Sequence, residues 1–261
     1  MKSLRRWCAG CQAVVLLASP PALSAELFYM DHDAVTDQFL GPVGPLVISG
    51  EIMPGDYDRL LAKIHGDENR FLAQNKIILA SDGGDVAEAI KIAALIKSLF
   101  SEVIVGPLTG RCVSACFFIY AAAEQREADG ERLIGINRPF LIDSDAAAAE
   151  SKALMEVRAF LKANDVPGYL VEEMFKHASD DAYWLSADDE KNLGFRSPAF
   201  NRYLRTKCAW DDAIERDAYA GKRSIDDLQQ MLDCRARVTN ADARKALALA
   251  AKAPREERKA H

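Results

Sequence analysis

Two short stretches decide the fold class: residues 76–84 read KIILASDGG, and residues 110–116 read GRCVSAC. The first opens as a strand that is apolar on both faces, as a buried parallel strand requires, and ends in a glycine turn. Residues 86–100 then repeat apolar side chains at helical spacing. The second stretch leads into residues 113–123, which predict a helix buried on all sides. Buried strands that alternate with helices are typical of an α/β fold.

The pattern extends in both directions from these stretches. Further strands are predicted at residues 46–49, 103–105 and 133–136, and a helix is predicted to begin near Asp56. After Pro139 the sequence is typical of helices. The chain divides into four expected parts: a signal segment (1–25), one α/β domain (26–203), a helical segment (204–239) and a flexible tail (240–261).

The amino-terminal segment is typical of a secretion signal. Three basic residues lie within residues 1–6, a short apolar run covers residues 7–18, and small residues follow. Cleavage is predicted after Ser24 or after Ala25. The alternative is a retained membrane anchor, but the run falls short of the roughly 20 apolar residues that a bilayer span needs. We therefore expect a periplasmic or secreted protein without a stable membrane span.

The charge of the chain argues against nucleic acid as a partner. The net charge is −6, and residues 1–25 carry three positive and no negative charges, so the remainder carries −9. A nucleic-acid-binding surface needs clustered positive charge.

Four cysteines lie outside the signal segment, and an even number is compatible with disulfides in an exported chain. Cys208 and Cys234 are placed to clamp two helices together. Cys112 and Cys116 stand four residues apart, where either a local disulfide or two small buried side chains would fit. We favour the disulfide, because the compartment is oxidising. Zinc is not expected, because no histidine pair accompanies the cysteines, and no cofactor is expected.

The order of these motifs resembles the Clp protease proteolytic subunit, ClpP, and the wider crotonase-like superfamily. Members have a Ser-Pro-Gly-Gly turn after a strand and, about 30 residues later, a Gly-x-x-x-Ser nucleophile that opens a buried helix. Gly110 to Ser114 fits this pattern, and Asp82 stands at the proline position. The resemblance implies a ββα superhelix with a helical C-terminal appendage. It implies Ser114 as the nucleophile, with the N–H groups of Gly84 and Ala115 as the oxyanion hole.

Two other members of the family's catalytic triad are changed in this chain. The family's histidine lies in a His-x-Pro segment about 25 residues after the serine, and here Asn137 stands before Arg138 and Pro139. Asparagine cannot accept the serine proton. The family's aspartate precedes a Phe-Leu-Ser-Ala segment. Ala182 aligns with it, and the nearest carboxylate is Asp181.

Two residues are candidates for a replacement base. Lys152 lies on the first helix past the sheet, and related peptidases use a lysine whose pKa is lowered by burial. The alternative is an ordinary solvated lysine. His177 could approach Ser114, although a surface or helix-capping histidine is the simpler interpretation.

Three functions remain open from the sequence. The first is an exported ClpP-like peptidase relative that binds peptide or protein segments with little or no hydrolysis. The second is a working serine peptidase that uses Ser114 with another base such as Lys152. The third is a non-catalytic scaffold that keeps only the self-association surfaces of the fold, and a homo-oligomer is an expected partner in that case.

Overall fold

The computed structural model describes residues 24–30, 44–106, 110–139, 147–178 and 181–253. The predicted signal segment therefore lies outside the described residues except for its last two positions, Ser24 and Ala25.

A five-stranded sheet forms the centre of the molecule, with strand order β1-β2-β3-β4-β6. The strand β1 (Glu26–Tyr29) is antiparallel to β2 (Leu46–Ser49), and the remaining pairs are parallel through β3 (Lys76–Ala80), β4 (Glu102–Val105) and β6 (Gln125–Ala128). A second sheet has the order β5-β7-β8. Its strands are short and cover Cys112–Val113, Ile134–Ile136 and Tyr183–Trp184.

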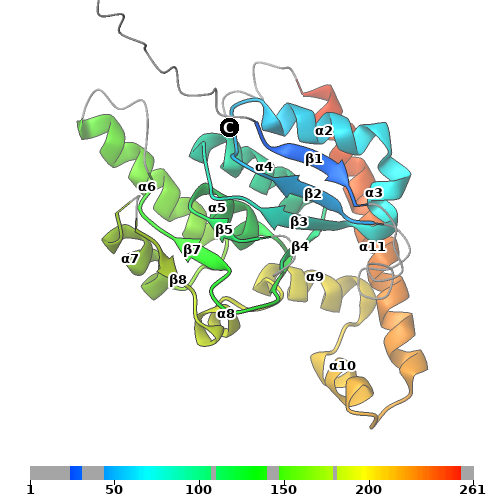
Figure 1. Ribbon diagram of the computed structural model, residues 1–261. Helices are drawn as coiled ribbons and strands as arrows, with labels where there is room; N and C mark the ends of the chain where they lie inside the picture. Colours follow the sequence, from blue (N-terminus) through cyan, green and yellow to red (C-terminus); the bar gives the residue numbers. More distant parts are fainter. Residues whose placement is uncertain (1–23, 31–43, 107–109, 140–146, 179–180, 254–261) are drawn as a thin grey trace, which may run out of the picture.

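The two sheets are linked by a repeated unit of two strands and a helix. The chain runs from β4 in the main sheet to β5 in the second sheet and returns through α5 (Ala115–Ala122), and it repeats this path through β6, β7 and α6 (Ala147–Ala163). After β3, Ser81 forms a bridge to Cys112 before α4 (Val86–Ser98) begins. This succession is the predicted ββα superhelix, and the α/β class is confirmed (Figure 1).

The core lies between the main sheet and the helices. All eight residues of α5 are buried, as predicted from their uniform apolarity, and α5 packs against α4. The helix α2 (Asp56–Gly66) buries Leu60, Leu61 and Ile64 in the same core. Two further segments complete this part of the chain: α3 (Glu68–Gln74) and β6, neither of which the sequence predicted.

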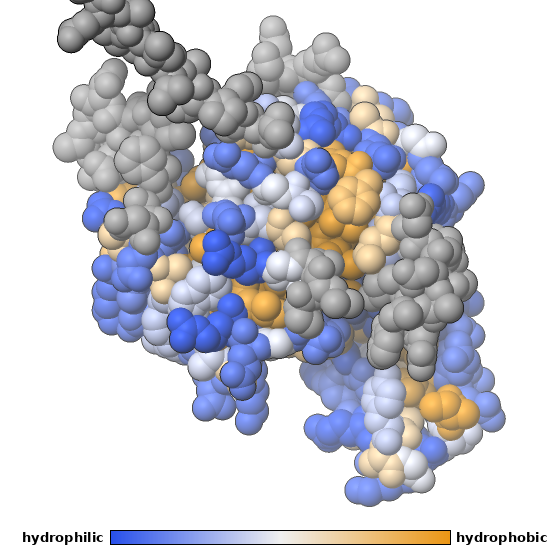
Figure 2. Space-filling view, viewed as in Figure 1, coloured by the Kyte–Doolittle hydropathy of each residue, from blue (hydrophilic) through white to orange (hydrophobic). Residues whose placement is uncertain are grey.

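An apolar row crosses the opposite face of the main sheet. The strand registers align Phe28, Val47, Ile78 and Ile104 side by side. Val47 and Ile78 are buried, whereas Phe28 is exposed. Figure 2 shows this apolar surface over β1 to β3.

The C-terminal part is helical, as expected. It comprises α7 (Gly168–Lys176), α8 (Ala187–Leu193), α9 (Pro198–Cys208), α10 (Asp212–Tyr219) and α11 (Ile225–Lys252). Ser186 is the N-cap of α8 and forms a capping box with Asp189. A disulfide between Cys208 and Cys234 joins α9 to α11, which confirms the expected clamp.

The structure differs from the sequence prediction at the start of the expected tail. Residue 240 marks no boundary, because α11 continues through it to Lys252. Ala243 and Leu247, one helical turn apart, are fully buried in the main core, and α11 lies along α2 (Figure 1). This packing stabilises a segment whose alanine-rich composition gave no clear sign of burial.

The described helices include none that is both long and apolar enough to cross a bilayer.

Candidate functional site

Ser114 occupies the turn between β5 and α5 in a rare backbone conformation, with φ of 56° and ψ of −122°. Residues other than glycine seldom adopt positive φ, and such a conformation costs about 1–3 kcal/mol unless the surroundings impose it. Here the Ser114 N–H donates to the Gly135 carbonyl at 3.0 Å, and the Ser114 carbonyl accepts from Phe117 N–H at 2.9 Å. A strained serine between a strand and a buried helix has the geometry of a nucleophile elbow.

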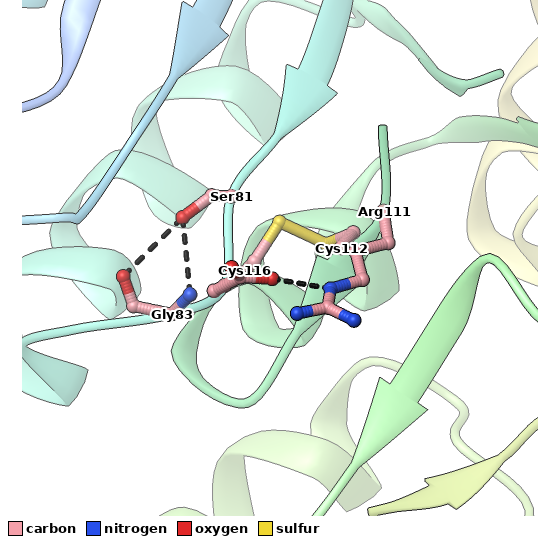
Figure 3. The surroundings of a disulfide bond; sticks show 6 residues. Ser81, Gly83, Arg111, Cys112 and Cys116 are labelled. Atoms are coloured by element: carbon pink, nitrogen blue, oxygen red, sulfur yellow. Dashed lines mark hydrogen bonds and ion pairs between the residues drawn. A yellow bond between two sulfur atoms is a disulfide. The ribbon is translucent and has the colours of Figure 1, made fainter. Parts of the chain in front are cut away.

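The glycine turn packs directly against this serine. A Cβ atom on Gly83 would lie 2.8 Å from Ser114 Cβ, so only glycine fits there. On its other side the turn is fixed to Ile52, whose N–H donates to the Gly83 carbonyl and whose carbonyl accepts from Asp85 N–H, both at 2.8 Å. Ser81 Oγ accepts from Gly83 N–H at 3.1 Å (Figure 3).

The predicted oxyanion donors belong to these two turns. Gly84 has φ of 133° and lies against Ile52, where a Cβ would be 2.2 Å from the Ile52 carbonyl oxygen. Ala115 is the first residue of α5 and is fully buried. Within the described part of the chain, neither backbone N–H has a hydrogen-bond acceptor. N–H groups in this position can bind an anionic oxygen.

A disulfide between Cys112 and Cys116 encloses the serine turn. The two Cα atoms are 5.3 Å apart, and both side chains are fully buried. The bond joins the first residue of β5 to the first turn of α5 (Figure 3), so Ser114 lies within a short covalent ring. The CxxxC spacing left this pairing open, and the structure supports the disulfide.

A groove of about 1020 Å³ opens beside the elbow. Its walls come from the end of β2, the glycine turn, the residues before β5 and the second sheet, and they include Gly83, Arg111, Arg132 and Trp184. The Arg111 side chain spans one rim: its Nε donates to Asp82 Oδ1 at 2.5 Å, and its guanidinium lies 5.8 Å from the Trp184 ring centroid. The polar and aromatic lining together suit a peptide.

Asn137 lies beyond the end of β7 and is buried, with 5% of the residue exposed. The parallel register pairs Val113 with Gly135, so Ser114 and Asn137 follow neighbouring strand ends. Ala182 lies over the same strand, because its Cβ would be 3.4 Å from a Cβ on Gly135. Ala182, which the sequence comparison aligned with the family's aspartate, carries only a methyl group.

His177 and Asp181 form a pair close to this strand end. His177 Nδ1 is 3.0 Å from Asp181 Oδ2, and the His177 carbonyl accepts from Arg138 N–H at 2.9 Å. The sequence assigned Asp181 as the displaced carboxylate but did not predict its contact with His177. The i, i+4 spacing was the available signal, although residues 179–180 lie outside the described part of the chain.

A second groove of about 510 Å³ has His177 in its wall and shares Arg132 and Trp184 with the first. Glu190 also lines it. Partial burial, with the nearby charge of Asp189, raises the pKa of the Glu190 carboxyl from 4.5 to about 6.

Lys152 has a different environment. It lies on α6 with its side chain 76% exposed, and its Nζ is 3.8 Å from Glu156 Oε1. A lysine base of this kind is a buried one, whereas the Lys152 side chain is largely exposed.

Comparisons with known proteins give similar folds at low identity. No protein-family model matches the chain, and a search of curated proteins found no match. Among solved structures, the 1510-N membrane-bound stomatin-specific protease is 17% identical, with a TM-score of 0.40, covering 62% of this chain and 82% of that one. ClpP1 from Listeria monocytogenes is 19% identical, with a TM-score of 0.41, covering 62% and 93%. The ClpP catalytic domain from Plasmodium falciparum is 18% identical, with a TM-score of 0.40, covering 64% and 90%.

Proposed function

We propose that this protein is an exported relative of ClpP-like serine peptidases that binds peptide segments in the groove beside Ser114 and hydrolyses them slowly or not at all. The observation that carries this proposal is the backbone of Ser114. Its φ of 56° and ψ of −122° occur between the two cysteines of the Cys112–Cys116 disulfide and directly against Gly83. Strain of this kind is retained where it serves a site.

Binding is supported by the walls of the groove. The N–H groups of Gly84 and Ala115 would donate hydrogen bonds to a peptide carbonyl oxygen, and Arg111 and Trp184 would contact side chains of the bound segment. These groups need no titratable base, so they can act in binding even where catalysis is lost.

Weak hydrolysis follows from the residue at the histidine position. The amide of Asn137 cannot take the proton of the Ser114 hydroxyl, and Ala182 provides no carboxylate. The serine would then remain a neutral hydroxyl, which is a poor nucleophile.

Export is part of the proposal. Two disulfides, Cys112–Cys116 and Cys208–Cys234, suit an oxidising compartment, and the basic and apolar composition of residues 1–25 suits a cleaved signal. We accordingly place the protein in the periplasm or outside the cell.

The test is labelling of the purified, oxidised protein with a fluorophosphonate, read by intact mass, beside Ser114→Ala. We expect no adduct on the folded wild-type protein. In a separate binding experiment, peptides from a library that the wild-type protein retains should no longer be retained by Arg111→Ala or by Trp184→Ala. A single adduct that disappears in Ser114→Ala would contradict the slow-hydrolysis part and indicate an activated serine.

A second candidate function, an active peptidase, is favoured by one observation, the 3.0 Å contact between His177 and Asp181. A histidine oriented by a carboxylate is the arrangement of a general base. If an adduct forms, His177→Asn should abolish it, with Lys152→Ala as the matched control on an exposed side chain. Asn137→His is the converse test, because restored hydrolysis would show that only the base is missing.

A further inference from the structure

The carboxylate of Asp56 is fully buried at the start of α2, where it accepts four hydrogen bonds. Its Oδ2 accepts from Met53 N–H at 2.8 Å and from Ala25 N–H at 3.2 Å. Its Oδ1 accepts from Arg59 Nη1 and from Ser24 Oγ, both at 2.5 Å. This site ties the first described residues of the chain to the core.

The burial of two neighbouring residues changes sharply at this point. Ala25 is fully buried in the main core, whereas Ser24 before it is exposed. Among the residues that the structure describes, Arg59 is the one cationic donor to Asp56, and its own side chain is 48% exposed. A buried carboxylate is costly unless it is well paired, and a second cation beside Oδ2 would stabilise it.

We propose that Asp56 is the binding site for a new amino terminus, which is produced by cleavage between Ser24 and Ala25. Water, delivered by a processing peptidase of the export pathway, breaks this peptide bond. The Ser24 carbonyl carbon gains the water oxygen and leaves as a carboxylate, and the Ala25 nitrogen gains both water protons and becomes an α-ammonium. That ammonium, already 3.2 Å from Asp56 Oδ2 as an amide, then forms a buried ion pair.

The structure separates the two cleavage positions that the sequence left open. Cleavage after Ala25 would remove a fully buried residue together with its hydrogen bond to Asp56. Cleavage after Ser24 removes an exposed residue together with its hydroxyl hydrogen bond to Asp56 Oδ1, and leaves Ala22 and Ser24 as the small side chains that a signal peptidase requires. Cleavage during export precedes folding, so the burial of Ala25 does not obstruct it. The inference rests on the export part of the proposed function and needs no activity of Ser114.

The ion pair would also brace the groove. A Cβ on Gly50, which lines the groove, would be 3.8 Å from Ala25 Cα. Met53 donates to Asp56, and its neighbour Ile52 holds the Gly83 carbonyl. The processed amino terminus is therefore connected through one short segment to the turn beside Ser114.

The first experiment is the intact mass of the protein recovered from the exported fraction after expression of the full chain. We expect a chain that begins at Ala25. A chain that begins at Leu23 or Glu26 overturns the inference while leaving export intact, whereas an unprocessed chain that remains in the cytosol overturns export as well.

The second experiment measures acylation of the Ala25 α-amine near pH 7 in the folded and the urea-unfolded protein. An ordinary α-amine has a pKa of about 7.7–8.0, and an ion pair that raises it by one unit slows labelling about tenfold, to which steric shielding of the buried amine adds. We expect the folded wild-type protein to be labelled at least that many times more slowly than the unfolded protein. A folded chain that retains Leu23 and Ser24 is the matched control, and its amine should react at the unfolded rate. Equal rates for the folded wild-type protein and this control overturn the docking, and Asp56→Asn should remove the protection wherever it folds.

Discussion

At the scale of single residues, the backbone of Ser114 has a measurable energetic consequence. A glycine there would adopt φ of 56° without the steric cost that any Cβ atom causes. Glycine would relieve a strain of about 1–3 kcal/mol, but it adds an entropy cost of about 0.5–1 kcal/mol on folding. Relief of strain should therefore be the larger effect.

We therefore predict that Ser114→Gly is more stable than Ser114→Ala by about 1 kcal/mol. Both variants lose the hydroxyl, so the difference reports the effect of a Cβ atom in this backbone conformation. Urea unfolding of the oxidised proteins measures it as a shift in midpoint at constant slope. Equal midpoints would mean that the turn carries no strain.

The sequence predicted the residues of the elbow better than their contacts. The order of Gly84, Ser114 and Asn137 was visible, because each stands at a recognisable junction of a strand with a turn. The contact of Gly83 with Ser114 and the pairing of His177 with Asp181 were not visible, since each depends on how separate segments meet. A single sequence gives spacing but not the direction in which a side chain points.

At the scale of secondary structure elements, β6 shows how a polar segment becomes part of a core. Its residues read QREA, which does not predict a buried strand, yet Arg126 is 2% exposed. The guanidinium donates to the carbonyls of Ala121, Leu193 and Gly194, which belong to the C-terminal ends of α5 and α8. Carbonyls at helix ends have no partner within the helix, and Arg126 satisfies them. Burial lowers the pKa of Arg126.

Arg126→Met should cost about 3 kcal/mol of stability, because it leaves buried carbonyls without donors. The control is Arg205→Met, since Arg205 is 58% exposed and pairs with Asp212 at the surface. That pair should contribute less than about 1 kcal/mol. Thermal unfolding of both variants gives the comparison, and similar losses would contradict the capping role of Arg126.

The helix α8 contains Glu190, whose protonation should change the stability of the folded protein with pH. The pKa of Glu190 is raised from 4.5 to about 6, so the folded protein holds this proton more tightly than the unfolded chain does. The stabilisation is complete below pH 4.5 and is lost as the pH rises through about 6. Glu190→Gln should make the melting temperature depend less on pH between these two values. Thermal unfolding measured at a series of pH values tests this. An unchanged slope would assign the pH dependence to other groups.

At the scale of the whole molecule, α11 connects two separate groups of buried side chains. Its first half packs Met231 against Phe200, Leu204 and Trp210, whereas its second half places Ala243 and Leu247 in the main core. The Cys208–Cys234 disulfide belongs to the first group only. This arrangement predicts that the two halves of one helix differ in their dependence on that disulfide.

Replacing Cys208 and Cys234 with serine should make local opening around α10 easier, whereas the second half of α11 should stay packed on the main core. The disulfide closes a loop of 26 residues, which corresponds to about 3.5 kcal/mol in the chain-entropy model. We expect hydrogen exchange to accelerate on the order of 100-fold for amides of α10 and the first half of α11, because local opening becomes easier. Amides near Leu247 should change little, since Arg244 still pairs with Glu68 at 2.8 Å and the core around Ala243 is untouched. A uniform acceleration along α11 would instead show that the appendage and the α/β domain unfold as one unit.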